Sequence, residues 1–189
     1  MLRRVPTSIL WMTDSGVLEP TWRQFRNEEI DPPEVNGKVW RIDLKTMICE
    51  VIDSGIGFAN GITYGPDGYL YVNETLTGDI FKYDISQPVP DREFFANAFP
   101  DVEMDESRRG VDGMAFDDKV RLYVTVIGYG DVAVFNQDGT LDKRIPLVGK
   151  GPTNLRFGAR GEKRIYVTEQ EIGQIEAYDV DADGMELYG

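Results

Sequence analysis

Hydrophobic and polar residues alternate in short runs along most of the chain, and these runs recur with a fixed layout. The clearest copy spans residues 57–84 (GFANGITYGPDGYLYVNETLTGDIFKYD), where three runs are separated by Pro66-Asp67-Gly68 and by Thr77-Gly78-Asp79. Alternation with a period of two is typical of a strand with one buried face, and proline followed by glycine is typical of a tight turn. This stretch therefore predicts three antiparallel strands.

The same layout returns twice downstream. In each copy an aromatic residue of the third strand follows the tyrosine of the second strand by twelve positions: Tyr71 and Tyr83, Tyr123 and Phe135, Tyr166 and Tyr178. The copies begin at Asn60, Asp112 and Thr153, which are 52 and then 41 residues apart. Repeats of roughly 40–50 residues built from short strands are typical of β-propeller blades.

A damaged copy precedes these three. Residues 8–13 match a second strand with Trp11 in the tyrosine position, and residues 39–43 and 47–52 match a third and an outer strand. Residues 1–7 carry no repeat pattern, so the inner strand of this blade is missing. Residues 17–36 are an insertion, which we expect to leave the blade as a loop, with Trp22 and Phe25 packed on the blade or lining a substrate entrance.

The sequence thus predicts one all-β domain over residues 1–189, with blades at about 9–53, 60–97, 112–147 and 153–188. The last blade is expected to end in an outer strand at residues 185–189. Missing strands would leave apolar blade faces bare, and such faces associate. We therefore expect a truncated copy of a longer protein, with self-association through the bare faces.

Composition and charge exclude several classes of partner and catalytic site. The net charge of −13 and the pI near 4.4 disfavour a nucleic-acid or anionic-membrane partner, because both need clustered lysine and arginine. The chain has no histidine, which removes His-based catalysis and His-rich metal sites. Its single cysteine, Cys49, is interpreted as a buried apolar residue in a strand. No signal peptide or membrane-spanning run is found, and we expect a cytoplasmic protein.

In combination, these motifs resemble a known family. The stretches FANGI with PDGYLYVNET, GVDGMAFDDKVRLYVTV, and GPTNLRFG with RIYVTE are similar to the gluconolactonase and senescence marker protein (regucalcin) family, from about Ile9 to the C-terminus. The resemblance implies an incomplete six-bladed β-propeller with one divalent metal ion, Ca²⁺ or Zn²⁺, in its central tunnel. It also implies three ligands: an N-terminal glutamate, the asparagine of the NG motif and the aspartate of the DG motif. Asn60 and Asp112 match the last two, and no residue here matches the glutamate.

The repeat itself also points to Asn60 and Asp112. They stand at the same place in successive copies, at the head of the innermost strand, so both side chains should face the propeller axis, and oxygen donors suit hard cations. Alternatively both are turn residues, because Asn-Gly and Asp-Gly are common in hairpins. Other polar residues are interpreted as structural. Asn154 lies beside Thr153, the residue equivalent to Asn60 and Asp112 in the last copy, and Glu74 is a surface or hairpin residue. Asp67, Asp79 and Asp138 lie in turns.

The family resemblance implies a metal-dependent hydrolase acting on a small-molecule lactone or sugar-acid substrate, with Asp112 assisting proton transfer. Without the glutamate, metal binding should be weak. Two alternatives stay open: a strictosidine-synthase-like or lyase-like propeller, and a non-catalytic binding or sensor propeller.

Overall fold

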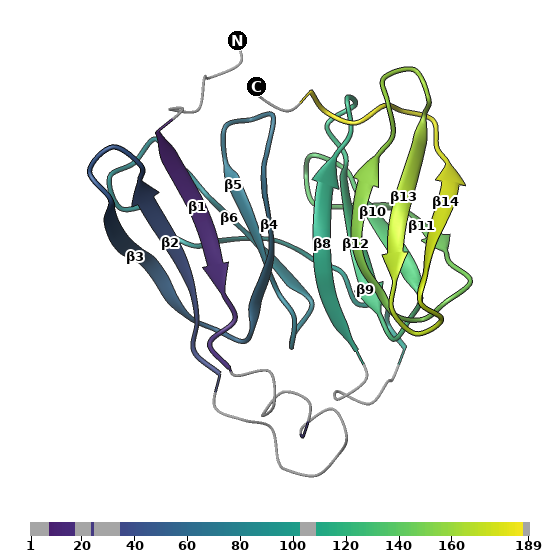
Figure 1. The fold of residues 1–189 in the computed structure, drawn as a ribbon, viewed down its shortest axis with the longest axis horizontal. Coiled ribbons are helices and arrows are strands. Elements are labelled where there is room, and N and C mark those ends of the chain that lie inside the picture. Colours follow the sequence, from purple (N-terminus) through teal and green to yellow (C-terminus); the bar gives the residue numbers. More distant parts are fainter. Residues whose placement is uncertain (1–7, 18–23, 25–34, 103–108, 187–189) are drawn as a thin grey trace.

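The computed structural model describes residues 8–17, 24, 35–102 and 109–186, and in these ranges it contains fourteen strands in four antiparallel sheets (Figure 1). The first sheet contains β1 (Ile9–Asp14), β2 (Gly37–Asp43) and β3 (Ile48–Ile56). The second contains β4 (Ala59–Tyr64), β5 (Leu70–Glu74), β6 (Asp79–Tyr83) and β7 (Glu93–Asn97). The third contains β8 (Gly110–Phe116), β9 (Leu122–Ile127), β10 (Asp131–Phe135) and β11 (Leu141–Pro146). The fourth contains β12 (Pro152–Phe157), β13 (Arg164–Glu169) and β14 (Gln174–Asp179).

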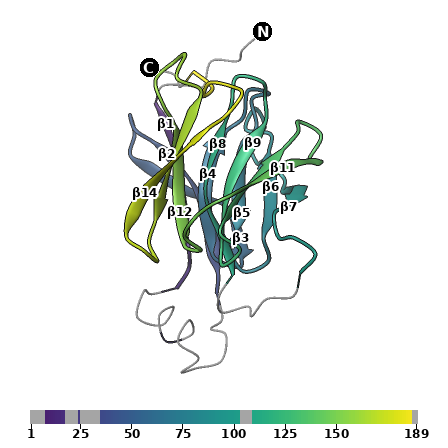
Figure 2. The same ribbon diagram turned by 90° about the vertical axis from the view of Figure 1, so that its right-hand side faces the viewer.

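Each sheet is built from strands that are consecutive in the sequence, and the sheets follow one another side by side (Figures 1 and 2). The innermost strands β4, β8 and β12 are neighbours, and β1 lies against β4. The chain therefore folds as an all-β, incomplete β-propeller. Within the described residues, no helix has the length and apolar character needed to cross a bilayer.

The repeated aromatic spacing reflects a shared hairpin register. In the second, third and fourth sheets the third-strand aromatic pairs with the residue just before the second-strand tyrosine: Leu70 with Tyr83, Leu122 with Phe135, and Ile165 with Tyr178. Because a shift of one residue would turn every side chain to the other face, an identical register places equivalent side chains on equivalent faces. The prediction of an internal structural repeat is confirmed.

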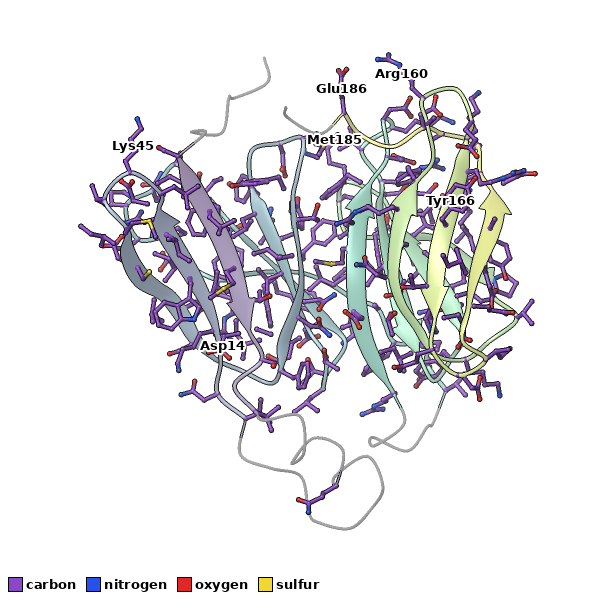
Figure 3. All side chains as sticks on the ribbon, viewed as in Figure 1. Asp14, Lys45, Arg160, Tyr166, Met185 and Glu186 are labelled. Carbon is purple, nitrogen blue, oxygen red and sulfur yellow. The ribbon has the colours of Figure 1, made fainter. Side chains whose placement is uncertain are left out.

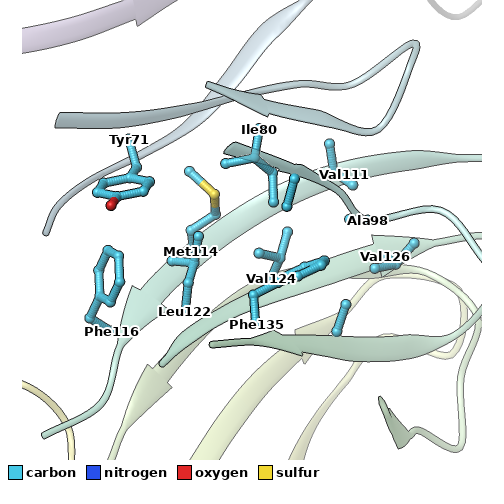
Figure 4. Packing of buried hydrophobic residues seen from close by; sticks show 12 residues of the cluster. Tyr71, Ile80, Ala98, Val111, Met114, Phe116, Leu122, Val124, Val126 and Phe135 are labelled. Atoms are coloured by element: carbon cyan, nitrogen blue, oxygen red, sulfur yellow. The ribbon is translucent and has the colours of Figure 1, made fainter. Parts of the chain in front are cut away.

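Three apolar clusters hold the sheets together, one between each neighbouring pair. The largest lies between the second and third sheets, where Tyr71 packs edge-on against Phe116 with ring centroids 5.0 Å apart (Figure 4). Edge-to-face aromatic pairs stabilise by about 1 kcal/mol beyond their burial. The blades are thus joined mainly by side-chain packing.

The C-terminal segment differs from the expected outer strand. In the described part, Asp117 and Gly184 form an isolated antiparallel bridge, and the Met185 amide donates to the Phe116 carbonyl (2.9 Å). Asp181 accepts hydrogen bonds from Arg121, Lys119 and Lys143, the first two at 2.7 Å and the third at 3.2 Å. These contacts hold the segment against the third sheet, and among the described residues no strand pairs with the free edge of β14. Residues 187–189 lie outside the described residues.

The first sheet has one apolar face without a neighbouring sheet among the described residues. Cross-strand pairing aligns Leu10, Ile42 and Cys49 in one row and Met12, Trp40 and Val51 in the next. Leu10, Met12 and Val51 are 47%, 42% and 46% exposed. Cys49 is also exposed, so its interpretation as a buried residue is wrong. Self-association through this face stays a prediction, and the expected insertion with Trp22 and Phe25 lies almost wholly outside the described residues.

A salt bridge joins the first two sheets. Arg92, just before β7, donates to Asp53 of β3 from Nε (2.6 Å) and Nη2 (2.9 Å), and Tyr83 donates to the same carboxylate (2.7 Å). Although burial opposes the ionisation of Asp53, the hydrogen bonds from Arg92 and Tyr83 bring its pKa below the ordinary value. The carboxylate therefore stays charged and depends on Arg92.

We expect Arg92→Ala to lower the free energy of unfolding by about 2 kcal/mol, because it leaves a half-buried carboxylate without its cation. Urea unfolding at neutral pH measures this loss. Arg160→Ala is the control: Arg160 and Glu186 lie 3.8 Å apart with side chains 86% and 90% exposed (Figure 3). Exposed pairs of this kind contribute little, and a loss of equal size in both variants would contradict the expectation.

Candidate metal site

Each innermost strand carries a bulge at the head of the repeat. In β4, Ala59 pairs with Glu74 and Ile62 with Val72, so Asn60 and Gly61 together face the single residue Asn73. In β8 the register shifts in the same way, and Asp112 with Gly113 faces Thr125. A shift also occurs in β12 between Pro152 and Asn154. Bulges re-aim side chains, and they are common beside functional sites.

Asn60-Gly61 and Asp112-Gly113 are therefore strand residues. They lie inside β4 and β8, so their alternative interpretation as hairpin turn residues is wrong. The two glycines have a different role, which is close approach between inner strands. A Cβ atom added to Gly61 would lie 2.0 Å from the Asp112 carbonyl oxygen, and one added to Gly113 would lie 2.2 Å from Asn154 Oδ1. The inner strands thus touch at their bulges.

The structure brings the Asn60 and Asp112 side chains together. The Asn60 amide lies close enough to the Asp112 carboxyl to lower its pKa. Asn60 Nδ2 also lies 3.2 Å from Thr75 Oγ1 and 3.5 Å from the Val111 carbonyl oxygen. Because Nδ2 faces these acceptors, Oδ1 is the atom of the amide left to approach a ligand. The two residues converge as the repeat predicts, and their role as metal ligands stays a prediction.

The Asp112 carboxyl is the electrostatic centre of this site. Burial raises its pKa to about 7, and the nearby Asn60 amide offsets only part of that rise. None of the described cationic side chains pairs with it. A buried carboxyl of this kind gains from a bound cation, which would favour its charged form.

The oxygen atoms of Asn60 and Asp112 are of the chemical type that binds divalent cations, but they are few. One carboxylate and one amide oxygen are the hard donors that Ca²⁺ takes, and Zn²⁺ also accepts carboxylate oxygen. In the part of the chain that the structure describes, no group of three or more His, Cys, Asp or Glu side chains could hold a metal ion. Asn60 and Asp112 would therefore leave most of the coordination places of Ca²⁺ to water or other oxygens.

Two buried polar residues beside this pair were not found from the sequence. Asn73 is fully buried: its Oδ1 accepts from the Gly61 amide (2.9 Å), and its Nδ2 donates to the Asp112 carbonyl (2.5 Å). Thr75 is 3% exposed and donates to the Val111 carbonyl (2.8 Å). The signal was present, because Asn73 stands two positions after the second-strand tyrosine and interrupts an apolar strand.

The other polar residues singled out in the sequence make local hydrogen bonds. Asn154 is exposed, and its Oδ1 accepts from the Leu155 amide (2.9 Å). Glu74 is a hairpin residue, since Thr77 Oγ1 donates to its carboxylate (3.0 Å), but it is buried and not on the surface.

The three turn aspartates differ from one another. Asp67 and Asp138 accept from backbone amides two residues on, those of Tyr69 (3.1 Å) and Thr140 (3.0 Å), as expected for turn residues. Asp79 instead begins β6 and accepts from the Asn97 side chain (2.7 Å).

Known structures share this fold. Regucalcin from Agrobacterium tumefaciens, described as a calcium-binding protein, matches with a TM-score of 0.70 at 18% identity, over 95% of this chain and 60% of that one. A gluconolactonase from Xanthomonas campestris matches with 0.63 at 24% identity, over 87% and 52%. Virginiamycin B lyase from Staphylococcus aureus matches with 0.53 at 16% identity, over 80% and 54%. At these identities the likeness shows the fold alone, and the chain spans 52–60% of the length of these three proteins.

Sequence comparison gives the family directly. No curated protein is significantly similar to this chain in sequence. A family model described as the SMP-30/Gluconolactonase/LRE-like region, however, matches residues 21–171, which is most of the chain. The chain belongs to the SMP-30/gluconolactonase/LRE-like family.

Proposed function

We propose that this chain is a metal-dependent hydrolase of sugar or related lactones, with Asn60 and Asp112 holding one divalent cation, Ca²⁺ or Zn²⁺. The observation that carries the proposal is the approach of the Asn60 and Asp112 side chains at the bulges of neighbouring inner strands, where a Cβ atom added to Gly61 would lie 2.0 Å from the Asp112 carbonyl oxygen. Burial also raises the pKa of the Asp112 carboxyl to about 7. Membership of the family supports the choice of a lactone substrate. The cation would polarise the lactone carbonyl.

In this proposal Asp112 also acts as the general base. One oxygen of the Asp112 carboxylate can hold the cation while the other is free to accept a proton, which is the arrangement that a general base needs. We assign Asp112 to accept the proton of the attacking water and to return it to the departing alcohol oxygen of the opened lactone. Asn60 holds the carboxyl in place through its amide. Since these two side chains supply few ligands, we expect weak metal binding and slow turnover.

A non-catalytic binding propeller is the second candidate. The small donor set favours it: among the described residues no group of three or more His, Cys, Asp or Glu side chains could hold a metal ion, and a weakly held cation suits reversible binding better than catalysis.

A metal titration with a lactone panel distinguishes the two candidates. The chelator-treated chain is titrated with Ca²⁺ and with Zn²⁺ by calorimetry, and hydrolysis of several aldonolactones is followed by pH-stat. The hydrolase predicts slow hydrolysis that the chelator removes and the metal restores. Metal binding without hydrolysis of any lactone supports the binding propeller. Hydrolysis that is insensitive to the chelator refutes the metal-dependent mechanism.

A further inference from the structure

The residue two positions after the second-strand aromatic is polar in every sheet. These residues are Thr13 after Trp11, Asn73 after Tyr71, Thr125 after Tyr123 and Thr168 after Tyr166. Strand positions packed between sheets are usually apolar, and a buried polar group is costly unless it is hydrogen-bonded. Asn73 and Thr125 are buried, Thr13 is half-buried and Thr168 is exposed, so the first three call for a shared kind of partner.

In three sheets the partner is the same backbone atom of the next blade. Thr13 Oγ1 donates to the Asn60 carbonyl (2.7 Å), and Asn73 Nδ2 donates to the Asp112 carbonyl (2.5 Å). Thr125 Oγ1 lies 3.5 Å from the Thr153 carbonyl oxygen. Each of these carbonyls belongs to the head residue of an innermost strand. At a bulge the extra residue loses its ladder partner, so its carbonyl needs a donor from outside its own sheet.

The two short hydrogen bonds, from Thr13 and Asn73, are accepted by the carbonyls of the two proposed metal ligands. The long contact, from Thr125, is to the carbonyl of Thr153. Asn73 makes the strongest link, because its amide can accept and donate at the same time. It accepts from the Gly61 amide (2.9 Å) in its own sheet and donates to Asp112 in the next. Thr125 has a single hydrogen to share between the carbonyls of Gly113 (3.3 Å) and Thr153 (3.5 Å). The Thr125 hydroxyl thus reaches the next strand less closely than the Asn73 amide does, whereas the Thr13 hydroxyl, at 2.7 Å, reaches it closely.

A hydrogen bond that holds the carbonyl group of Asn60 or Asp112 also helps to fix the direction in which the side chain of that residue leaves the backbone. This follows because the carbonyl carbon and Cβ are both bonded to the same Cα. Oxygen ligands of Ca²⁺ must lie within a narrow range of about 2.3–2.6 Å from the ion, so small backbone shifts at Asn60 or Asp112 change affinity. Partners that orient metal ligands typically change affinity 10–100-fold when they are removed.

From these contacts we infer that Thr13 and Asn73 are positioning residues, which set the metal affinity of the site by holding the backbones of Asn60 and Asp112. The inference rests on the proposed function, since it assumes that these two residues bind the cation. Neither Thr13 nor Asn73 contacts the cation. They act from the preceding blade, so the affinity of the site depends on how closely each blade packs on the next.

Calorimetric titration of the full chain with Ca²⁺ at pH 8 tests this inference, with urea unfolding of each variant in parallel. Thr13→Val removes the hydroxyl at nearly constant shape and should weaken Ca²⁺ binding at least 10-fold, while Thr13→Ser keeps the hydroxyl and should stay within about 3-fold of the wild type. Asn73→Thr installs the residue that the next blade carries and should weaken binding about 10-fold. Thr168→Val is the matched control: Thr168 occupies the same repeat position, but among the described residues it bonds within its own sheet, to Asn154 (3.3 Å) and Thr153, so binding should not change.

The outcomes separate this inference from the function on which it rests. Wild-type affinity in Thr13→Val and Asn73→Thr, together with loss of binding in Asp112→Asn, overturns the positioning role and leaves the metal site standing. Wild-type affinity in Asp112→Asn, or absence of Ca²⁺ and Zn²⁺ binding by the wild type, overturns both. Equal weakening by Thr13→Val and Thr13→Ser shows that the hydroxyl is not the cause and also overturns the inference. If Asn73→Thr fails to fold, the two Thr13 variants decide the question.

Discussion

Gly61→Ala is expected to lower the free energy of unfolding by about 3 kcal/mol or more and to abolish metal binding. The new Cβ would lie 2.0 Å from the Asp112 carbonyl oxygen and 2.7 Å from Asn73 Nδ2. The first of these atoms is backbone, so β4 and β8 must move apart to relieve the clash. That movement also separates Asn60 from Asp112. Urea unfolding and Ca²⁺ titration of the same preparation measure the two effects.

Gly173→Ala separates this clash from the conformational effect of losing a glycine. Gly173 has a φ of 77° and no atom within 4 Å of an added Cβ, so its replacement should cost only about 1 kcal/mol. It should leave metal binding unchanged. Similar losses of stability in the two variants would show that β4 and β8 accommodate a Cβ atom at Gly61 without strain, and would contradict the predicted clash.

Asp112→Asn is expected to abolish divalent metal binding and to raise the stability of the metal-free chain at pH 8. An aspartate carboxyl in water has an ordinary pKa of 3.8, and burial raises the pKa of Asp112 to about 7 in the fold. The folded state therefore binds the extra proton between these values, and stability falls as the pH rises from about 4 to about 7. Above pH 7 this loss reaches up to about 4 kcal/mol, and an asparagine does not suffer it. Urea unfolding at pH 5 and pH 8 measures the difference.

In excess Ca²⁺ the wild type should instead be more stable than Asp112→Asn at pH 8, because a bound cation stabilises only the chain that keeps the carboxylate. Below pH 7 protons compete with the metal, so the Ca²⁺ affinity of the wild type should fall by up to tenfold per pH unit. Asp138→Asn is the control: this turn aspartate bonds to Thr140 and lies in no inner strand, so metal binding should not change. Wild-type pH dependence in Asp112→Asn would contradict the assignment of the titrating group.

The sequence predicted the features that local pattern determines. The twelve-residue spacing led directly to the shared hairpin register, because Leu70, Leu122 and Ile165 must pair with the third-strand aromatics once the turn lengths match. It also brought Asn60 and Asp112 together, since equivalent positions of neighbouring blades lie side by side around one axis.

The sequence did not reveal what depends on contacts between blades. The short apolar run around Met185 suggested a strand, but the three cations that bind Asp181 are distant in sequence and draw the chain elsewhere. Cys49 looked like a core residue because nothing local shows that the face of its sheet is bare. Thr13 and Asn73 were missed because their partners are backbone carbonyls of the next blade, which no residue type marks.

Construction of each sheet from consecutive strands has a consequence for folding. Strand pairs in the second, third and fourth sheets close over short loops, so each of these sheets can form early and by itself. Cooperativity between sheets then comes from the apolar clusters at their boundaries. Among the residues that the structure describes, the second and third sheets each have two such boundaries, whereas the first and fourth have one. Spontaneous opening should therefore begin at the outer sheets and reach the β4–β8 boundary, where Asn60 meets Asp112, last of all.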